Sequence, residues 1–110
     1  MSLLSTKQMW PSGIAFVDSQ AVAADTALIA AVAGKRIVID SIFASCGTAV
    51  GTFFLEHGST AMTPSFHLGV SGNMSLYDVS IAAPVGVAVT YTTAGAASVQ
   101  SILVRYHLEG

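Results

Sequence analysis

Three histidines, one cysteine and a few carboxylates are the side chains of this 110-residue chain that could support catalysis. A nucleophilic enzyme needs a nucleophile, a base and a group that orients the base, all within hydrogen-bonding reach. Cys46 or a serine would be the nucleophile, and the other roles would fall to residues among His57, His67, His107, Asp40 and Asp78. No G-x-S-x-G pattern or Cys-His motif surrounds any of them. We therefore predict a protein that is not an enzyme and has no catalytic residues.

The histidine spacing also argues against a bound metal. His57 and His67 lie ten residues apart, and Glu56 precedes the first of them. Neighbouring residues of a strand point to opposite faces, so only one of Glu56 and His57 could join His67. Two ligands make a poor site. Residues 69–73 are rich in glycine but lack the lysine and the helix of a phosphate-binding loop. We expect no metal and no other cofactor.

Charged residues are scarce. They make up 9% of the chain, hydrophobic residues make up 53%, and the formal net charge is -2. Lys35 and Arg36 form a basic pair that is too small for nucleic-acid binding. Pro84 and Gly95 interrupt the longest uncharged stretch before it reaches the length of a transmembrane helix. The residues before Pro11 contain no apolar run of signal-peptide length. We predict no nucleic-acid or membrane partner.

The same composition predicts self-association. An average soluble domain contains about 25% charged residues, and an isolated monomer usually displays many of them. With so few here, the surface must consist of small neutral residues or be covered by other subunits. We expect both, and therefore a homo-oligomer.

Alternating apolar residues and turn residues divide the chain into about eight short strands. They are residues 14–17, 26–33, 36–46, 50–57, 61–68, 74–81, 85–92 and 99–108. Residues 26–33 also fit a helix capped by Asp25 and Gly34. Apolar residues on both faces favour a strand, and the helix would have barely two turns. Pro64 places residues 61–68 at an edge or in a loop.

This pattern predicts an all-β fold, an antiparallel, jelly-roll-like β-sandwich, although an up-and-down barrel has the same period. Residues 26–46 are expected to form a central hairpin that turns at Gly34, Lys35 and Arg36. Residues 14–108 are predicted to be one sandwich domain, and residues 1–13 an arm in which Trp10 is the anchor. Residues 1–3 and 109–110 are interpreted as remnants of an expression vector.

Residues 26–34 carry apolar side chains on both faces, whereas a single sandwich offers each strand only one inward face. The second face needs a partner. We therefore predict that Leu28, Ile29 and Val32 belong to a subunit interface, to which Trp10 of the arm also contributes.

A family resemblance attaches to the segment that begins at Asp25. DTALIAAVAGKRIVIDSIFASCGTAVGTFFLEHGST resembles a group of small proteins from tailed-bacteriophage and prophage genomes. The matching parts are the segment ALIAAVAGKRIV at 27–38, a hydrophobic strand at 39–44, and a strand that enters a Gly-Ser-Thr turn at 53–60. The likeness covers roughly residues 25–107. It implies a compact β-sandwich in the virion, in the head, tail or a fibre.

From this resemblance and the composition we expect a non-enzymatic structural protein that assembles in the host cytoplasm and resides in the virion. Its partners would be its own copies and other virion proteins, and a trimer is expected by analogy with capsid-decorating and fibre proteins. The alternative is a carbohydrate- or receptor-binding β-sandwich module. Clustered exposed aromatic residues would distinguish it, and the candidates are Trp10, Tyr77, Tyr91 and Tyr106.

Overall fold

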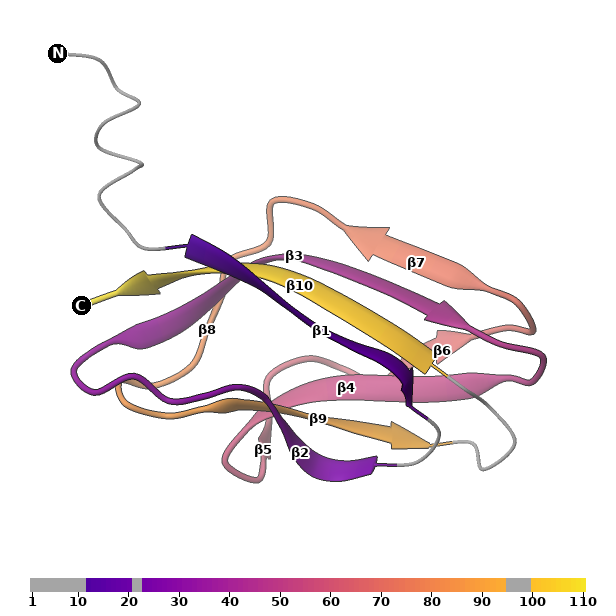
Figure 1. Cartoon of the computed structure of the whole chain (residues 1–110), viewed down its shortest axis with the longest axis horizontal. Coiled ribbons are helices and arrows are strands. Elements are labelled where there is room, and N and C mark those ends of the chain that lie inside the picture. Colours follow the sequence, from indigo (N-terminus) through magenta and orange to yellow (C-terminus); the bar gives the residue numbers. More distant parts are fainter. Residues whose placement is uncertain (1–11, 21–22, 95–99) are drawn as a thin grey trace, which may run out of the picture.

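A computed structural model describes residues 12–20, 23–94 and 100–110 of the chain. Within these residues every regular element is a β-strand, and two antiparallel sheets pack against each other (Figure 1). The prediction of an all-β, antiparallel β-sandwich is confirmed. The described part of the chain contains no helix of the length and hydropathy needed to cross a membrane.

The two sheets have five strands each. Sheet A has the order β1-β10-β3-β7, and β8 also pairs with β3. Its strands are β1 (Ser12–Gln20), β10 (Gln100–Glu109), β3 (Arg36–Cys46), β7 (Asn73–Leu76) and β8 (Ile81–Ala82). Sheet B has the order β2-β9-β4-β5, and β6 also pairs with β4. Its strands are β2 (Ala23–Ile29), β9 (Val89–Ala94), β4 (Gly51–His57), β5 (Thr60–Ala61) and β6 (Phe66–Leu68).

The strand pairs are nested along the sequence. Strand β1 pairs with β10, β2 with β9, β3 with β7 and β8, and β4 with β5 and β6. The chain thus forms one long antiparallel ribbon, whose successive segments alternate between sheet A and sheet B. A ribbon wrapped in this way is the jelly-roll arrangement, as predicted.

The predicted hairpin of residues 26–46 is wrong, although its turn is present. Gly34 has a φ of 76°, and the N–H of Lys35 donates to the carbonyl of Val32 at 3.1 Å. However, β2 belongs to sheet B and β3 to sheet A. Turn residues indicate that the chain reverses, but they do not say whether the two strands share a sheet. Here the chain crosses the gap of about 10 Å that separates packed sheets.

The described residues contain ten strands, where about eight were expected. Pro64 separates β5 from β6, and Asp78, with a φ of 56°, separates β7 from β8. Strand β9 begins only at Val89, because a turn with Gly86 at a φ of 75° precedes it. Ser12 already belongs to β1, although residues up to 13 were predicted as an arm.

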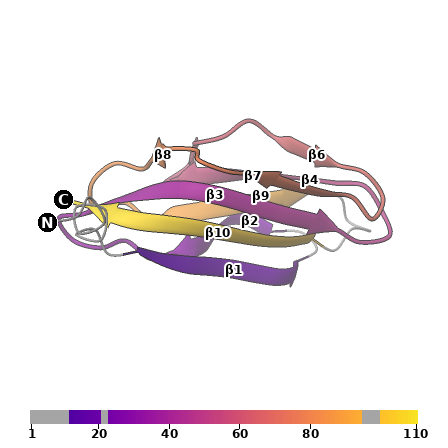
Figure 2. The ribbon, with the colours of Figure 1, turned by 90° about the horizontal axis from the view of Figure 1, so that it is seen from above.

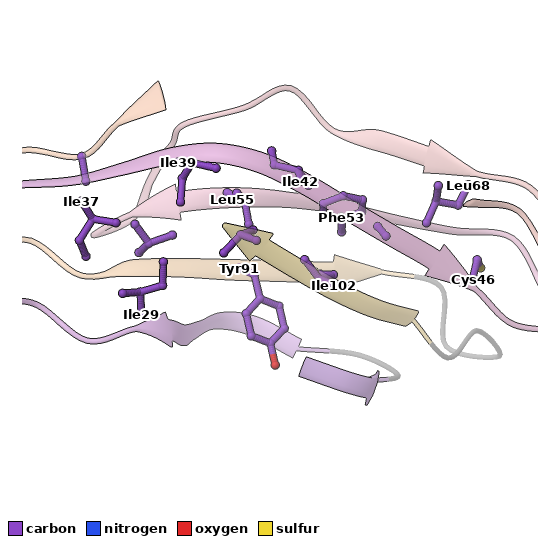
Figure 3. Packing of buried hydrophobic residues seen from close by; sticks show 14 residues of the cluster. Ile29, Ile37, Ile39, Ile42, Cys46, Phe53, Leu55, Leu68, Tyr91 and Ile102 are labelled. Atoms are coloured by element: carbon purple, nitrogen blue, oxygen red, sulfur yellow. The ribbon is translucent and has the colours of Figure 1, made fainter. Parts of the chain in front are cut away.

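The core lies between the sheets (Figure 3). Its largest fully buried aliphatic and aromatic side chains include Ile37, Ile39, Ile42, Phe53, Leu55 and Ile102. Cys46 is 8% exposed at one end of this core, and its thiol donates to the carbonyl of Ala49 at 2.7 Å. Cys46 therefore packs here as a small buried hydrophobic residue.

Candidate functional site

Three apolar side chains form a row across the outer face of sheet A. Phe16 of β1 lies directly opposite Leu103 of β10, and Leu103 lies opposite Phe43 of β3. Directly opposed residues of an antiparallel pair point to the same face of the sheet. Val17 and Ala44, their neighbours in sequence, pack in the core. The row therefore points away from the core, toward the surface.

Two further side chains extend the row. Ile14 precedes Phe16 by two residues and points to the same side of β1. Tyr77, just after β7, packs edge-on against Phe43 with 5.3 Å between ring centroids. Ile14 is 60% exposed, Phe16 69% and Tyr77 66%. We call Ile14, Phe16, Phe43, Tyr77 and Leu103 the aromatic face.

An open hollow of about 300 Å³ lies beside Phe16, Phe43 and Leu103. Its lining is almost entirely apolar, except where Ser101 donates to the carboxylate of Asp18 at 2.7 Å. This volume is at the low end of the range for sites that hold small molecules. The hollow thus offers an apolar surface with one polar end, a shape that suits either a protein side chain or a small ligand.

Farther along the outer face of sheet A, a histidine lies between two carboxylates. Nδ1 of His107 is 2.9 Å from both carboxylate oxygens of Asp40, and Nε2 is 2.6 Å from Oε2 of Glu109. The register between β3 and β10 shifts here. Arg105 pairs with Ser41, and the next residue, Tyr106, pairs with Ile39, so the pairing skips Asp40. Asp40 is therefore the extra residue of a β-bulge, which directs its side chain toward His107.

The two carboxylates control the protonation of His107. Partial burial by itself would lower the pKa of His107, but the hydrogen bonds and negative charges of Asp40 and Glu109 outweigh it and raise the pKa above 6.5. An Asp-His pair also orients the base in hydrolase triads. Here, however, the second ring nitrogen meets Glu109, where a hydrolase would place a hydroxyl or thiol. The arrangement is suited to linking β3 and β10, and not to activating a nucleophile.

Sheet B carries a hydrogen-bonded network that links β2, β9 and β4. Thr92 donates to the carboxylate of Glu56, which is only 6% exposed, and Thr90 donates to Asp25 at 2.7 Å. The N–H of Asp25 in turn donates to the hydroxyl of Thr92 at 2.9 Å. These polar groups bind one another, so we interpret the network as structural.

The predicted interface residues fall into different environments. Ile29 is 6% exposed and belongs to the core of the single chain (Figure 3), so its assignment to a subunit interface is corrected. Leu28 is partly buried against the same core, and Val32 is 37% exposed beyond the end of β2. Trp10 lies outside the described residues. Leu28, Val32 and Trp10 therefore stay predictions.

The two histidines considered as metal ligands lie toward opposite ends of β4. His67 pairs with Thr52, and His57 is five residues farther along that strand, which corresponds to roughly 16 Å. Among residues 12–20, 23–94 and 100–110, no group of three or more His, Cys, Asp or Glu side chains is arranged so that it could hold a metal ion.

The sequence reasoning did not identify the aromatic face. Alternation along residues 14–17 puts Ile14 and Phe16 on one side of their strand. It does not say which side meets solvent. A signal was present, because residues 14–17 are apolar on both sides of the strand, as residues 26–34 are. The same argument for a second covered face therefore applied to β1.

No protein-family model matches the chain, and no curated protein matches it significantly. Among solved structures, the nucleoplasmin-like N-terminal domain of Drosophila FKBP39 is similar at a TM-score of 0.51, with 10% identity over 93% of this chain and 92% of that one.

Two further structures have lower scores. The CBM36-1 domain of a xylanase from the hindgut metagenome of Trinervitermes trinervoides has a TM-score of 0.47, with 9% identity over 90% of this chain and 97% of that one. A chain of the extra small virus particle of the prawn Macrobrachium rosenbergii has a TM-score of 0.43, with 10% identity over 92% of this chain and 80% of that one. At 10% identity, the likeness to the nucleoplasmin-like domain concerns the fold alone, and no argument rests on the two structures with lower scores.

Proposed function

We propose that this protein is a non-enzymatic structural component of a tailed-bacteriophage or prophage virion, which assembles as a symmetric homo-oligomer. The component would be a head decoration, a fibre or a tail part, assembled in the host cytoplasm with other virion proteins. The phage context rests on the resemblance of residues 25–107. The assembly rests on the aromatic face.

The aromatic face is the observation that carries the proposal. Three large apolar side chains that are 60% to 69% exposed lie on one face of one sheet. Apolar patches of this kind on soluble proteins mark interaction surfaces, because exposed rings gain free energy when a partner removes them from water. A chain with only 9% charged residues also has little means of keeping such a face solvated.

Sedimentation equilibrium of the full chain at micromolar concentration tests the assembly. We expect an oligomer, with a trimer as the size that the resemblance implies. Phe16→Ser combined with Phe43→Ser should lower the mass at equal concentration. Val70→Ser is the matched control, because Val70 is 62% exposed in the loop between β6 and β7 and is not one of the residues of the aromatic face. A wild-type chain that remains monomeric at these concentrations would refute the proposal.

A second candidate function is a carbohydrate- or receptor-binding module. It is favoured by the aromatic rings of Phe16, Phe43 and Tyr77, which lie beside a hollow whose polar end is formed by Asp18 and Ser101. Sugars bind through stacking on aromatic rings together with a few hydrogen bonds to fixed polar groups. A glycan array separates the two functions: a hit that Phe16→Ser abolishes supports the binding module, and a blank array with an oligomeric protein supports the structural role.

A further inference from the structure

We propose that two copies of this chain join through their β1 strands, which pair antiparallel about a two-fold axis and merge the two A sheets into one. This inference rests on the proposed assembly and specifies its contact and symmetry. The observation behind it is that residues 12–17 of the edge strand β1 lack the features that usually prevent pairing.

From Ser12 to Val17 the β1 edge offers a regular, uncharged backbone. Among the strands that the structure describes, β1 pairs only with β10 and ends the order of sheet A, and Figure 2 shows it along the margin of the sandwich. Its register with β10 is unbroken from Ser12 to Val17. These six residues include no charged residue and no proline. An edge of this kind is a template for another strand.

The other edges within the described residues are protected. On the far side of sheet A, β7 has four residues and β8 two, and Asp78 with its positive φ separates them. In sheet B, β2 has two register shifts and carries Asp25, also at positive φ. Strands β5 and β6 have two and three residues, with Pro64 between them. Short strands, bulges, charges and proline all hinder edge pairing. In β1 the one charged residue, Asp18, and the one register shift come after Val17, so residues 12–17 differ from the other edges.

The occupant that fits best is a second copy of β1. Two identical strands that pair antiparallel form a closed two-fold contact, because each copy gives and receives the same bonds. If Ala15 lies on the axis, Ile14 of each copy faces Phe16 of the other copy. Aromatic and β-branched residues opposed across strands stabilise a sheet. Each copy would thereby cover the two most exposed β1 side chains of the other.

This register also avoids a clash of like charges. With Ala15 on the axis, Asp18 faces Ser12 of the other copy, and Gly13 faces Val17. Moving the register by two residues in one direction would place Asp18 opposite Ile14, and in the other direction Phe16 opposite Ser12. A one-residue shift would place outward side chains of one copy opposite inward side chains of the other. The charge and apolar pattern of β1 therefore selects one register.

Charge substitution at the edge tests the contact. Ile14→Lys with Phe16→Lys brings four positive charges together across the axis, and Ile14→Glu with Phe16→Glu brings four negative charges together. Native mass spectrometry and sedimentation should show that each variant raises the dissociation constant of the two-fold contact on the order of tenfold or more. An equimolar mixture of the two variants should restore it. Ile14 lies opposite Arg105 of β10, so a lysine at this position also faces a like charge within its own chain. A glutamate there faces an opposite charge, so the Glu variant excludes repulsion within the chain as the cause of a weaker contact.

Val70→Lys is the matched control, since Val70 is similarly exposed but lies in the loop between β6 and β7, outside the aromatic face. It should leave the contact unchanged, and circular dichroism should show that all variants remain folded. The wild type should form even-numbered species: a dimer, or a hexamer if the predicted trimer also forms.

The outcomes separate this inference from the proposed function. An oligomer that withstands both charged variants, that loses its contact with Val70→Lys, or that is only a trimer overturns the β1 contact and leaves the proposed assembly standing. A wild-type monomer overturns both.

Discussion

Replacing Thr92 by valine should destabilise the fold through a single buried carboxylate. Glu56 is 6% exposed, and the hydroxyl of Thr92 donates to its carboxylate from the neighbouring strand. Valine has nearly the shape of threonine, so packing is retained and the hydroxyl is lost. The same hydroxyl accepts from the N–H of Asp25, but that N–H is exposed and can bind water instead. The expected effect therefore comes from Glu56.

The size of the effect follows from the kind of bond. Hydrogen bonds to charged groups contribute about 1.5–3 kcal/mol, and a buried group left without its donor costs a comparable amount. We expect Thr92→Val to lower the free energy of unfolding by about 2 kcal/mol. Thr92→Ser keeps the hydroxyl and should lose much less. In a Glu56→Met background, Thr92→Val should be close to neutral, because no carboxylate remains to be satisfied.

Urea denaturation followed by circular dichroism measures these values. The protein concentration must be equal for all variants, since association stabilises the folded state by mass action. The reasoning is refuted if Thr92→Val and Thr92→Ser have the same stability, or if the loss persists unchanged in the Glu56→Met background. Either result would mean that Glu56 is solvated in the folded protein.

Two further predictions concern His107 and the pair Ile29 and Val32. The folded-state pKa of His107 is raised, so its ion pairs stabilise the fold below pH 6.5 and are lost as the pH rises through the folded pKa. His107→Gln should therefore lower the free energy of unfolding by a few tenths to about 1 kcal/mol near pH 5.5, and by less near pH 9. Urea denaturation at both pH values measures this difference. A loss of stability that grows with pH would contradict the prediction. Ile29→Ala should lower the free energy of unfolding by about 2–5 kcal/mol because Ile29 is a core residue, whereas Val32→Ala should change it by less than about 0.5 kcal/mol. Equal shifts of the melting temperature for the two variants would contradict this difference in burial.

The sequence was most informative where a strand is long and regular. The limits of β3 were predicted at residues 36–46 and are observed there, because β-branched residues alternate between clear turns at both ends. For the nested pairing, the sequence predicted the jelly-roll-like fold class but not which strands pair with one another. Which strands share a sheet depends on contacts between distant segments, and the hairpin at Gly34 was predicted wrongly for that reason.

The β-bulge at Asp40 shows a second limit of sequence reasoning. Unbroken alternation along residues 36–46 would place Ile39, Ser41 and Phe43 on one side of the strand. In the structure Ile39 and Ile42 both face the core, because the bulge changes the phase of the alternation between them. The bulge is defined by the register between β3 and β10, and no residue type within β3 indicates it. Alternation therefore could not place Phe43 on the outer face.

The way the acidic residues are used strengthens the case for assembly. Of the six acidic residues in the sequence, five accept hydrogen bonds from side chains of the same chain or share one with His107: Asp18, Asp25, Asp40, Glu56 and Glu109. Their charges are directed at neighbours within the fold, and Glu56 is buried. The charge left to keep the surface hydrated is therefore smaller than the composition suggests. A protein with this surface and an exposed aromatic face lowers its free energy when other copies cover that face.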